Sequence, residues 1–401
     1  NPKIYPKGSF IYRLAGRDRE KSASYYTPES LTQCLVKHSL KELLSEKTSA
    51  DILQLKICEP AMGSAAFLNE VVSQLAQAYL DLRQKEVGKR IPNEEFIQEL
   101  QKVKMRLADQ NVFGVDLNPV AVELAEVSLW LNSIFAPEKQ RAFVPWFSQQ
   151  LVCGNSLIGA RRQIYRVNQI PISNDSGIKK PEKPFYENTP EELKWDIEFP
   201  SDGIFHFLLP YPGMASYNDK LITQLEPEAI NICKKWSKAF IGDAFTESQI
   251  SHLQRLSKII DSLWNDWANQ QHELRERTTD RLKVWADPNG QKEGEWTSLK
   301  LKDRIQEQEV QGQNVTNTNA RLRLKWAMDY WTSLWFWPIS QASLLPSREI
   351  WLLELSMILG DLEQGVTTEL GQINLFADTQ PKQFAMNFSD RHGFVNIEKL
   401  K

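Results

Sequence analysis

The sequence contains few of the residues and segments that metal-binding, disulfide-bonded and membrane proteins require. Its 401 residues include four cysteines and five histidines, and neither type shows a spacing typical of metal ligands. Cys58 and Cys153 lie in short apolar runs, so we expect them to be buried thiols of a reducing compartment. No apolar run reaches membrane-spanning length and no signal peptide opens the chain, which predicts a cytoplasmic protein without membrane contact.

An excess of charge of either sign is also lacking. The chain has 48 Lys and Arg residues against 51 Asp and Glu residues, which gives a formal net charge of −3. Nucleic-acid-binding domains usually have a basic surface, so any contact with DNA must be local or be made by other regions. The length allows two or more domains with sizeable cores.

The segment from Lys56 to Leu68 contains a turn without the three-glycine spacing of dinucleotide-binding sites. A short apolar strand ends at Glu59, small residues follow, and a helix is predicted after them. Because Gly63 is the only glycine here, a pyrophosphate clamp is disfavoured. Gly63 and Ala61 still let the backbone approach a ligand, and the helix directs free N–H groups at it. This favours S-adenosylmethionine, which has no phosphate; an ordinary strand-to-helix turn is the alternative.

Two later segments repeat the pattern of an apolar strand that ends in a polar side chain. Residues 112–116 end in Asp116, and an acid at such a strand end binds ribose hydroxyls in doubly wound sheets. Helix capping is the alternative role, but Asn118 is placed to cap the next helix and leave Asp116 free. The run 150–157 ends in a turn where Asn155 could read an adenine edge; a plain turn is the alternative.

A fourth segment, Ser-Tyr-Tyr-Thr-Pro-Glu at residues 24–29, precedes a run of leucines at helical spacing. Thr27 is expected to be the N-cap of this helix and Pro28 its first residue. A helix start explains the Thr-Pro pair, but it does not require the two tyrosines before it. We therefore include this segment among the candidate ligand-binding motifs.

Together the four segments resemble the class I S-adenosylmethionine-dependent DNA adenine-N6 methyltransferases, particularly the large restriction-type and phage-defence (BREX and DISARM-like) methylases. The Tyr-Thr-Pro motif precedes the glycine turn, as in the gamma arrangement of that family. Ala65 stands where the family has a second glycine, which is tolerable if Ala65 already lies in the helix. The resemblance implies that the cofactor is bound by Tyr26, Thr27, Pro28, Glu59, Pro60, Ala61, Met62, Gly63, Phe67, Asp116, Leu117 and Asn155.

The resemblance also indicates which parts of such a methyltransferase this sequence lacks. In the family a catalytic Asn/Asp-Pro-Pro-aromatic loop and a target-recognition region follow the cofactor motifs, and neither is visible in this sequence. Because the chain begins with Asn1 and not with Met, we expect a piece of a longer protein whose catalytic loop lies beyond Lys401. The catalytic residues are thus unknown, and the chain alone is expected to be inactive. DNA should be bound mainly by regions absent from this chain, and subunits of a defence system are further candidate partners.

Two other classes of function stay open. A non-catalytic S-adenosylmethionine-binding or interaction module of a defence complex would have no catalytic loop at all. A nicotinamide-dependent dehydrogenase would use a similar sheet, but the glycine pattern disfavours it. We see no acid-and-lysine cluster typical of a nuclease.

The expected fold class is α/β, with a partial Rossmann-like methyltransferase sheet and a large, mainly helical insertion. We divide the chain into a basic lead-in (1–24), the cofactor-binding core (25–160), a loop-rich connector (161–215), the helical insertion (216–360) and a polar tail that leads towards the missing catalytic motif (361–401).

The predicted insertion is rich in Trp and Leu at helical spacing. Leu253, Ile260 and Trp264 belong to one apolar helix face, and a dense aromatic cluster extends from Trp326 to Trp337. Aromatic side chains near basic ones could stack on bases. We favour packing in a core, because the aromatics outnumber the nearby charges and lie at helical spacing.

Overall fold

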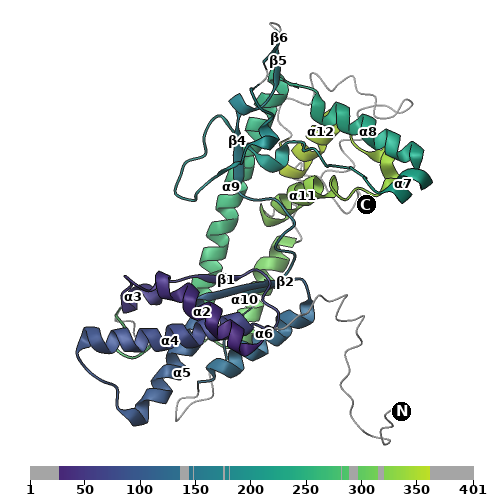
Figure 1. Ribbon diagram of the computed structural model, residues 1–401. Coiled ribbons are helices and arrows are strands. Elements are labelled where there is room, and N and C mark those ends of the chain that lie inside the picture. Colours follow the sequence, from purple (N-terminus) through teal and green to yellow (C-terminus); the bar gives the residue numbers. More distant parts are fainter. Residues whose placement is uncertain are drawn as a thin grey trace, which may run out of the picture. The chain divides into compact units, whose positions relative to one another are not determined.

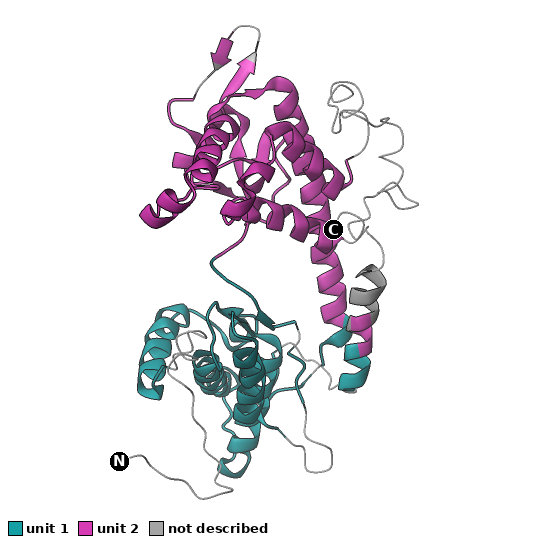
Figure 2. Cartoon of the chain, turned by 90° about the vertical axis from the view of Figure 1, so that its right-hand side faces the viewer, with its two compact units in different colours: residues 1–157, 277–303 teal, residues 158–276, 304–401 magenta. Residues whose placement is uncertain are grey.

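The chain forms two compact units, which are coloured separately in Figure 2. Unit 1 consists of residues 1–157 and 277–303, and unit 2 of residues 158–276 and 304–401. A computed structural model describes residues 27–135, 144–147, 149–174, 177–179, 181–280, 282–288, 297–314 and 320–361. The predicted lead-in lies outside the described residues, as does the predicted tail after Asp361.

Unit 1 is built on three short parallel strands (Figure 1). Its elements outside the segment 277–303 are α2 (Glu29–Leu43), α3 (Ser49–Ile52), β1 (Ile57–Glu59), α4 (Ala66–Val87), α5 (Asn93–Gln110), β2 (Val112–Asp116), α6 (Pro119–Ser133) and β3 (Leu151–Cys153). The strand order is β1-β2-β3, with Glu59 beside Gly114 and Asp116 beside Cys153. The carboxyl ends of all three strands therefore meet at one edge of the sheet.

The described helices of unit 1 gather on one face of this sheet. α4, α5 and α6 contact the strands, and α2 packs against α4 (Figure 1). Val112 and Leu151 point to the helices and are buried, whereas Cys58 and Val152 on the opposite face are exposed. Parallel sheets are usually covered on both faces. In the described part of the chain, helices cover only one face of this sheet.

The expectation that Cys58 and Cys153 are buried is wrong, because both are exposed. Cys58 lies on the face that the described helices leave open, and Cys153 lies at the very end of β3. Partial burial and the nearby Glu59 carboxylate raise the pKa of the Cys58 thiol, which lowers its thiolate fraction. An apolar run identifies a strand, but it does not say which face another element covers.

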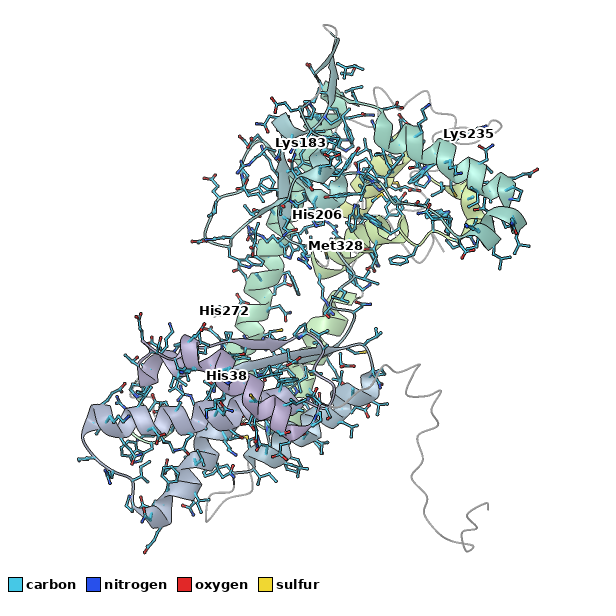
Figure 3. All side chains as sticks on the ribbon, viewed as in Figure 1. His38, Lys183, His206, Lys235, His272 and Met328 are labelled. Carbon is cyan, nitrogen blue, oxygen red and sulfur yellow. The ribbon has the colours of Figure 1, made fainter. Side chains whose placement is uncertain are left out.

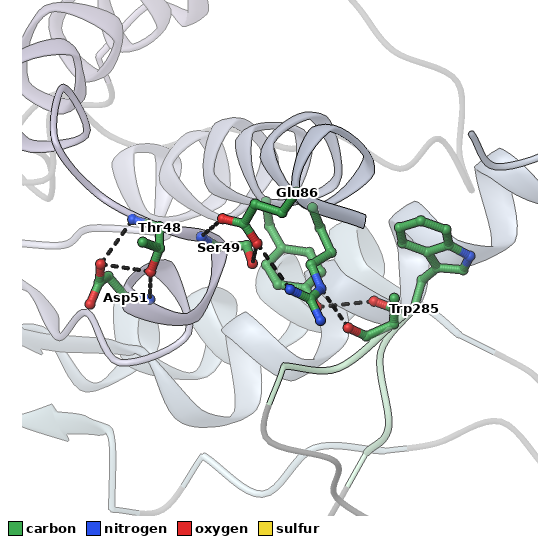
Figure 4. A network of polar contacts seen from close by, with 8 residues as sticks. Thr48, Ser49, Asp51, Glu86 and Trp285 are labelled. Carbon is green, nitrogen blue, oxygen red and sulfur yellow. Dashed lines mark hydrogen bonds and ion pairs between the residues drawn. The ribbon is translucent and has the colours of Figure 1, made fainter. Parts of the chain in front are cut away.

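Residues 277–303 belong to unit 1, although the sequence analysis placed them in the helical insertion. The Tyr79 hydroxyl donates to the Trp285 carbonyl at 3.0 Å, and Arg83 Nε donates to the Ala286 carbonyl at 2.6 Å. Arg83 also pairs with Glu86, which accepts the backbone N–H and the hydroxyl of Ser49 (Figure 4). A continuous polar network thus joins α3, α4 and the returning segment.

Two buried ion pairs hold the same segment. Arg106 on α5 pairs with Asp287, and Lys302 pairs with Asp280 at 2.7 Å. All four side chains are at most 4% exposed. Arg106 Nη1 also donates to the carbonyl of Leu282 at 3.3 Å. The two contacts of Arg106 join residues more than 170 positions apart, so sequence spacing could not predict them.

Unit 2 combines two small sheets with helices. Its elements, with the ends of α9 and α10 that enter unit 1, are β4 (Gln163–Arg166), η1 (Val167–Gln169), β5 (Ile172–Asn174), β6 (Gly177–Lys179), η2 (Phe185–Glu187), β7 (Glu191–Glu192), β8 (Gly203–Phe205), η3 (His206–Leu208), α7 (Lys220–Leu225), α8 (Pro227–Gly242), β9 (Phe245–Thr246), α9 (Glu247–Thr278), α10 (Leu299–Asn314), α11 (Ala320–Ser333), η4 (Ile339–Leu344) and α12 (Arg348–Leu359). The strand orders are β7-β4-β8 and β6-β5-β9.

Residues 161–215, expected as connecting loops, contribute part of the unit 2 core. Ile164, Phe205 and Leu208 are fully buried and pack in one cluster with residues of α9, α11 and α12. The prolines and short charged stretches of this region suggested loops. The strands between them are only two to four residues long, and they are held by tertiary contacts that local patterns do not reveal.

The preference for core packing of the Trp326–Trp337 cluster is confirmed at Trp331. This side chain is 8% exposed, and its indole Nε1 donates to the carbonyl of Leu209 at 3.0 Å. The Trp331 ring also meets the rings of Tyr211 and Trp335 edge to face. Phe336, in contrast, is 64% exposed, so the cluster is only partly internal.

Burial of His206 predicts an acid-sensitive core in unit 2. Its Nε2 accepts the backbone N–H of Arg161 at 2.9 Å, and burial lowers its pKa from 6.5 to about 4. The neutral ring is therefore favoured in the folded state, and the stability this confers is complete above about pH 6.5. We expect a loss of roughly 3 kcal/mol in unfolding free energy as the pH falls from 6.5 to 4.

The measurement is chemical denaturation across this pH range, with His206→Gln and the exposed His272→Gln as a matched pair. The His206→Gln variant should lose this pH-dependent part of the stability, while His272→Gln should keep it. Identical slopes for both variants would contradict the assignment.

Candidate cofactor-binding site

The site is formed where β1 and β2 end and the chain turns into α4. Met62 N donates to the carbonyl of Val115 at 3.0 Å, and Gly63 N donates to Asp116 Oδ2 at 2.8 Å. The other oxygen of Asp116, Oδ1, accepts the N–H of Asn118 at 2.8 Å. The carboxylate of Asp116 therefore fixes the glycine turn of one strand to the end of its neighbour.

Asn118 caps α6 as predicted. Its side-chain oxygen accepts the N–H of Val120, and Pro119 occupies the first turn of the helix. Asp116 does not cap this helix, but its carboxylate accepts two backbone N–H groups, and its availability to a ligand stays a prediction. An ionised carboxylate has about four lone-pair positions, so two acceptor positions are left for a ligand.

The turn contains two left-handed residues, of which one is not a glycine. Gly63 has φ 54°, and Ala65 has φ 66° at the position just before α4, which begins at Ala66. The condition under which alanine would be tolerated here, that Ala65 already lies in the helix, is therefore not met. A left-handed alanine costs about 1–2 kcal/mol relative to the right-handed form. This conformation gives a physical reason why a glycine suits the position.

Gly114 on β2 is a site residue that the sequence analysis missed. A Cβ at Gly114 would lie 2.2 Å from Met62 Sδ and 3.2 Å from Met62 Cβ. Met62 is only 3% exposed, and its side chain packs against β2. A glycine inside a strand run is the signal for such a close approach.

Gly114→Ala should therefore destabilise unit 1 by about 1–3 kcal/mol, because the new methyl group overpacks against Met62. Gly154→Ala is the matched control, since a Cβ there meets nothing nearer than 3.9 Å. The free energy of unfolding by urea measures both. Equal effects of the two substitutions would show that the packing of Met62 on β2 does not constrain the turn.

The remaining predicted residues of the two strand ends differ in how deeply they are buried. Glu59 is half-buried, and desolvation raises the pKa of its carboxyl. Pro60 and Ala61, which follow Glu59, and Leu117, which follows Asp116, are exposed, whereas Phe67 is partly buried against the core. The site thus has a small backbone turn between two acids.

The Tyr-Thr-Pro segment is only partly described. Tyr26 lies outside the described residues. α2 begins at Glu29, with Pro28 in the N-cap position and no side-chain capping bond, so the prediction of Thr27 as the cap is wrong. Thr27 instead lines a polar cavity of about 330 Å³, whose wall includes Ala66 at the start of α4. Thr27 is therefore placed near the helix that follows the turn.

Asn155 lies just beyond β3. Its side-chain oxygen accepts the N–H of Leu157 at 2.9 Å, which forms a local turn, and Gly154 N donates to the carbonyl of Asp116. The turn that the sequence analysis gave as the alternative is thus present. Contact of Asn155 with an adenine stays a prediction.

The sequence also did not reveal two buried side-chain amides that bind backbone carbonyls at the starts of the strands. Gln150 Nε2 donates to the carbonyls of Val112 and Ala108, and Asn111 Nδ2 donates to those of Leu53 and Leu55. In the sequence, such a buried amide is indicated only by its position directly before an apolar strand run.

Within the described residues, no group of three or more His, Cys, Asp and Glu side chains is suited to hold a metal. The histidines labelled in Figure 3 come from separate elements, His38 from α2, His206 from η3 and His272 from α9. No helix in the described ranges is both long and apolar enough to cross a membrane.

Comparison with known protein families finds no family that matches the chain. Among curated proteins, the chain is similar to a protein of Methanocaldococcus jannaschii described as "Putative type II restriction enzyme and methyltransferase". The two are 25% identical over 206 residues, which cover 40% of this chain and 16% of the relative. The chain therefore matches a small part of a much longer protein.

Proposed function

We propose that this chain contains the S-adenosylmethionine-binding part of a DNA methyltransferase of the restriction-modification or phage-defence type. The supporting observation is the Gly63 turn, whose N–H group is held by Asp116 at the carboxyl edge of parallel strands. The order β1-β2-β3 fits one half of a Rossmann-like methyltransferase sheet. The similarity to the archaeal protein supports the same class.

The residues of the site fit this cofactor. Asp116 has acceptor positions left for the ribose hydroxyls, and the exposed Leu117 next to it offers an apolar surface for the adenine. The backbone of Ala61 and Gly63 would receive the methionine end. Glu59, whose pKa is raised by burial, would gain a favourable interaction with the positive charge of the ligand. When bound, the cofactor supplies a methyl group on a sulfonium.

We further propose adenine N6 as the methyl acceptor in the full-length protein. The exocyclic amine of adenine is a poor nucleophile, so the base must be flipped and its N–H groups accepted by a loop. The 401 residues contain no Pro-Pro pair, and therefore no Asn/Asp-Pro-Pro-aromatic loop. We therefore infer that the chain alone binds the cofactor without transferring the methyl group to DNA.

The binding site is tested by Asp116→Ala. We expect S-adenosylmethionine to bind roughly 5- to 150-fold more weakly, because charge-assisted hydrogen bonds of about 1–3 kcal/mol are lost. Isothermal titration calorimetry measures the affinity. Asp219→Ala, which removes a helix-capping acid of α7 in unit 2, is the control and should bind like the parent. Unchanged affinity of Asp116→Ala, or tighter binding of NAD than of S-adenosylmethionine by the parent, would refute the site.

A non-catalytic cofactor-binding module is the second candidate, and the missing acceptor loop is the observation that favours it. The two candidates differ in one measurement on the full-length protein. Transfer of tritium from labelled S-adenosylmethionine to adenine in mixed-sequence DNA supports the methyltransferase. Binding of the cofactor without transfer supports the module.

A further inference from the structure

Helix α6 has an apolar stripe on its exposed side. Ala125 and Leu129 face the core and are fully buried, as expected for a helix packed on a sheet. Four large aliphatic residues on the other side are nonetheless exposed by 46% to 59%. These residues, which we call the α6 seam, are Val120, Leu124, Val127 and Leu131.

The spacing of the α6 seam is four, three and four residues, which is the repeat of a coiled-coil contact line. Scattered apolar residues are normal on protein surfaces, but a continuous stripe along a whole helix marks an interaction surface. A stripe with this repeat fits the side chains of a second helix between its own. Neither a strand nor an extended loop has the matching period.

One side of the seam is acidic. Glu123 is exposed next to the seam, and Glu126 lies further round the helix on the same side, where it is half-buried and has a pKa raised by burial and by Glu123. α6 contains no Lys, Arg or His. A partner helix with basic residues along this side of its apolar stripe would bring them next to the carboxylate of Glu123 and reduce the negative charge that Glu126 adds behind it.

A cleft continues from the seam. It has a volume of about 320 Å³, and its lining includes Val127 of the seam together with Glu126 and Trp130. Its far wall contains Trp146, whose indole Nε1 donates to Asp303 Oδ1 at 3.0 Å. The cleft would accept a large side chain of a helix that lies along the seam.

We propose that the α6 seam is the docking site of an amphipathic helix of a partner protein, with apolar residues at heptad spacing and Lys or Arg at the flanking positions. A second copy of α6 is disfavoured as the occupant, because antiparallel pairing would place the acidic side of one α6, with Glu123, against the acidic side of the copy. The proposal does not depend on cofactor binding, since none of the seam residues is assigned to the cofactor site.

The test uses two synthetic peptides of about three heptads, both with Leu at the a and d positions. One carries Lys at the e and g positions and the other Glu, so that like charges disfavour self-pairing of either peptide. Fluorescence anisotropy with the full chain should detect binding of the Lys peptide. Binding of the Glu peptide should be at least about tenfold weaker.

Three variants make the test specific to the seam. Leu124→Lys should weaken binding of the Lys peptide by about tenfold or more, through loss of an apolar contact and added repulsion. Leu221→Lys, at a leucine on α7 that is 62% exposed against 46% for Leu124, should change nothing. The double variant Glu123→Lys with Glu126→Lys should reverse the preference between the peptides, and it leaves every seam residue in place.

Several results would overturn the proposal. These are failure of both peptides to bind, equal binding of both, or binding of the Lys peptide that Leu124→Lys leaves unchanged. Sedimentation of the chain as a dimer that Leu124→Lys converts to a monomer would identify a second copy as the occupant instead.

Discussion

Arg106→Ala should lower the free energy of unfolding of unit 1 by about 3–5 kcal/mol. The reason is its partner Asp287, whose side chain is fully buried and would lose the guanidinium that pairs with its charge in the interior. The same substitution removes the donor to the carbonyl of Leu282. Chemical denaturation followed by circular dichroism and tryptophan fluorescence measures the loss.

The controls separate the buried charge from charge loss in general. Arg166→Ala removes an arginine that pairs with Glu191 and Asp202 at the surface, and it should cost no more than about 1 kcal/mol. The double replacement Arg106→Met with Asp287→Leu should recover most of the loss, because it removes both charges from the interior. If Arg106→Ala and Arg166→Ala are equally mild, the segment around Asp287 does not hold unit 1 together.

Trp264→Ala should destabilise unit 2 by about 3–5 kcal/mol, the usual cost of deleting a large buried aromatic. Trp264 on α9 is 7% exposed, and its ring lies 5.4 Å from that of Phe205 and 5.9 Å from that of Phe207. Urea denaturation gives the loss in stability. Phe336→Ala, at a 64% exposed aromatic, is the control and should cost less than about 1 kcal/mol.

This pair also decides between the two interpretations of the aromatic residues. A change near zero in the stability of Trp264→Ala, with weaker binding of DNA, would make this face of α9 a recognition surface. A large loss of stability supports the core interpretation.

The elements that could be predicted from sequence are those determined by local chemistry. An apolar run that ends in an acid correctly located the ends of β1 at Glu59 and of β2 at Asp116. The Asn-Pro pair at 118–119 correctly located the start of α6, because an amide that caps a helix needs only the next two residues. The assignment of these residues to a cofactor site rests on the same patterns and stays a prediction.

The contacts of Asp116 and Met62 could not be predicted in the same way. That Asp116 holds Gly63, and that Met62 packs on Gly114, depends on which strands are neighbours and in which register they pair. A shift of one residue would place every side chain of a strand on the other face. The packing of the whole sheet determines the register, so the register cannot be predicted from the sequence of any single strand.

The sequence by itself determined where β1 and β2 end, where α6 begins, the small turn between Glu59 and α4, and the lack of any Pro-Pro pair. Only the tertiary structure decided that the described helices cover one sheet face, that the stripe on α6 is exposed, and that the segment around Asp287 belongs to unit 1. Caps and turns are made within a few residues, whereas burial depends on which distant segment covers a surface. Many segments have an apolar face, and only the packed chain selects the one that is buried.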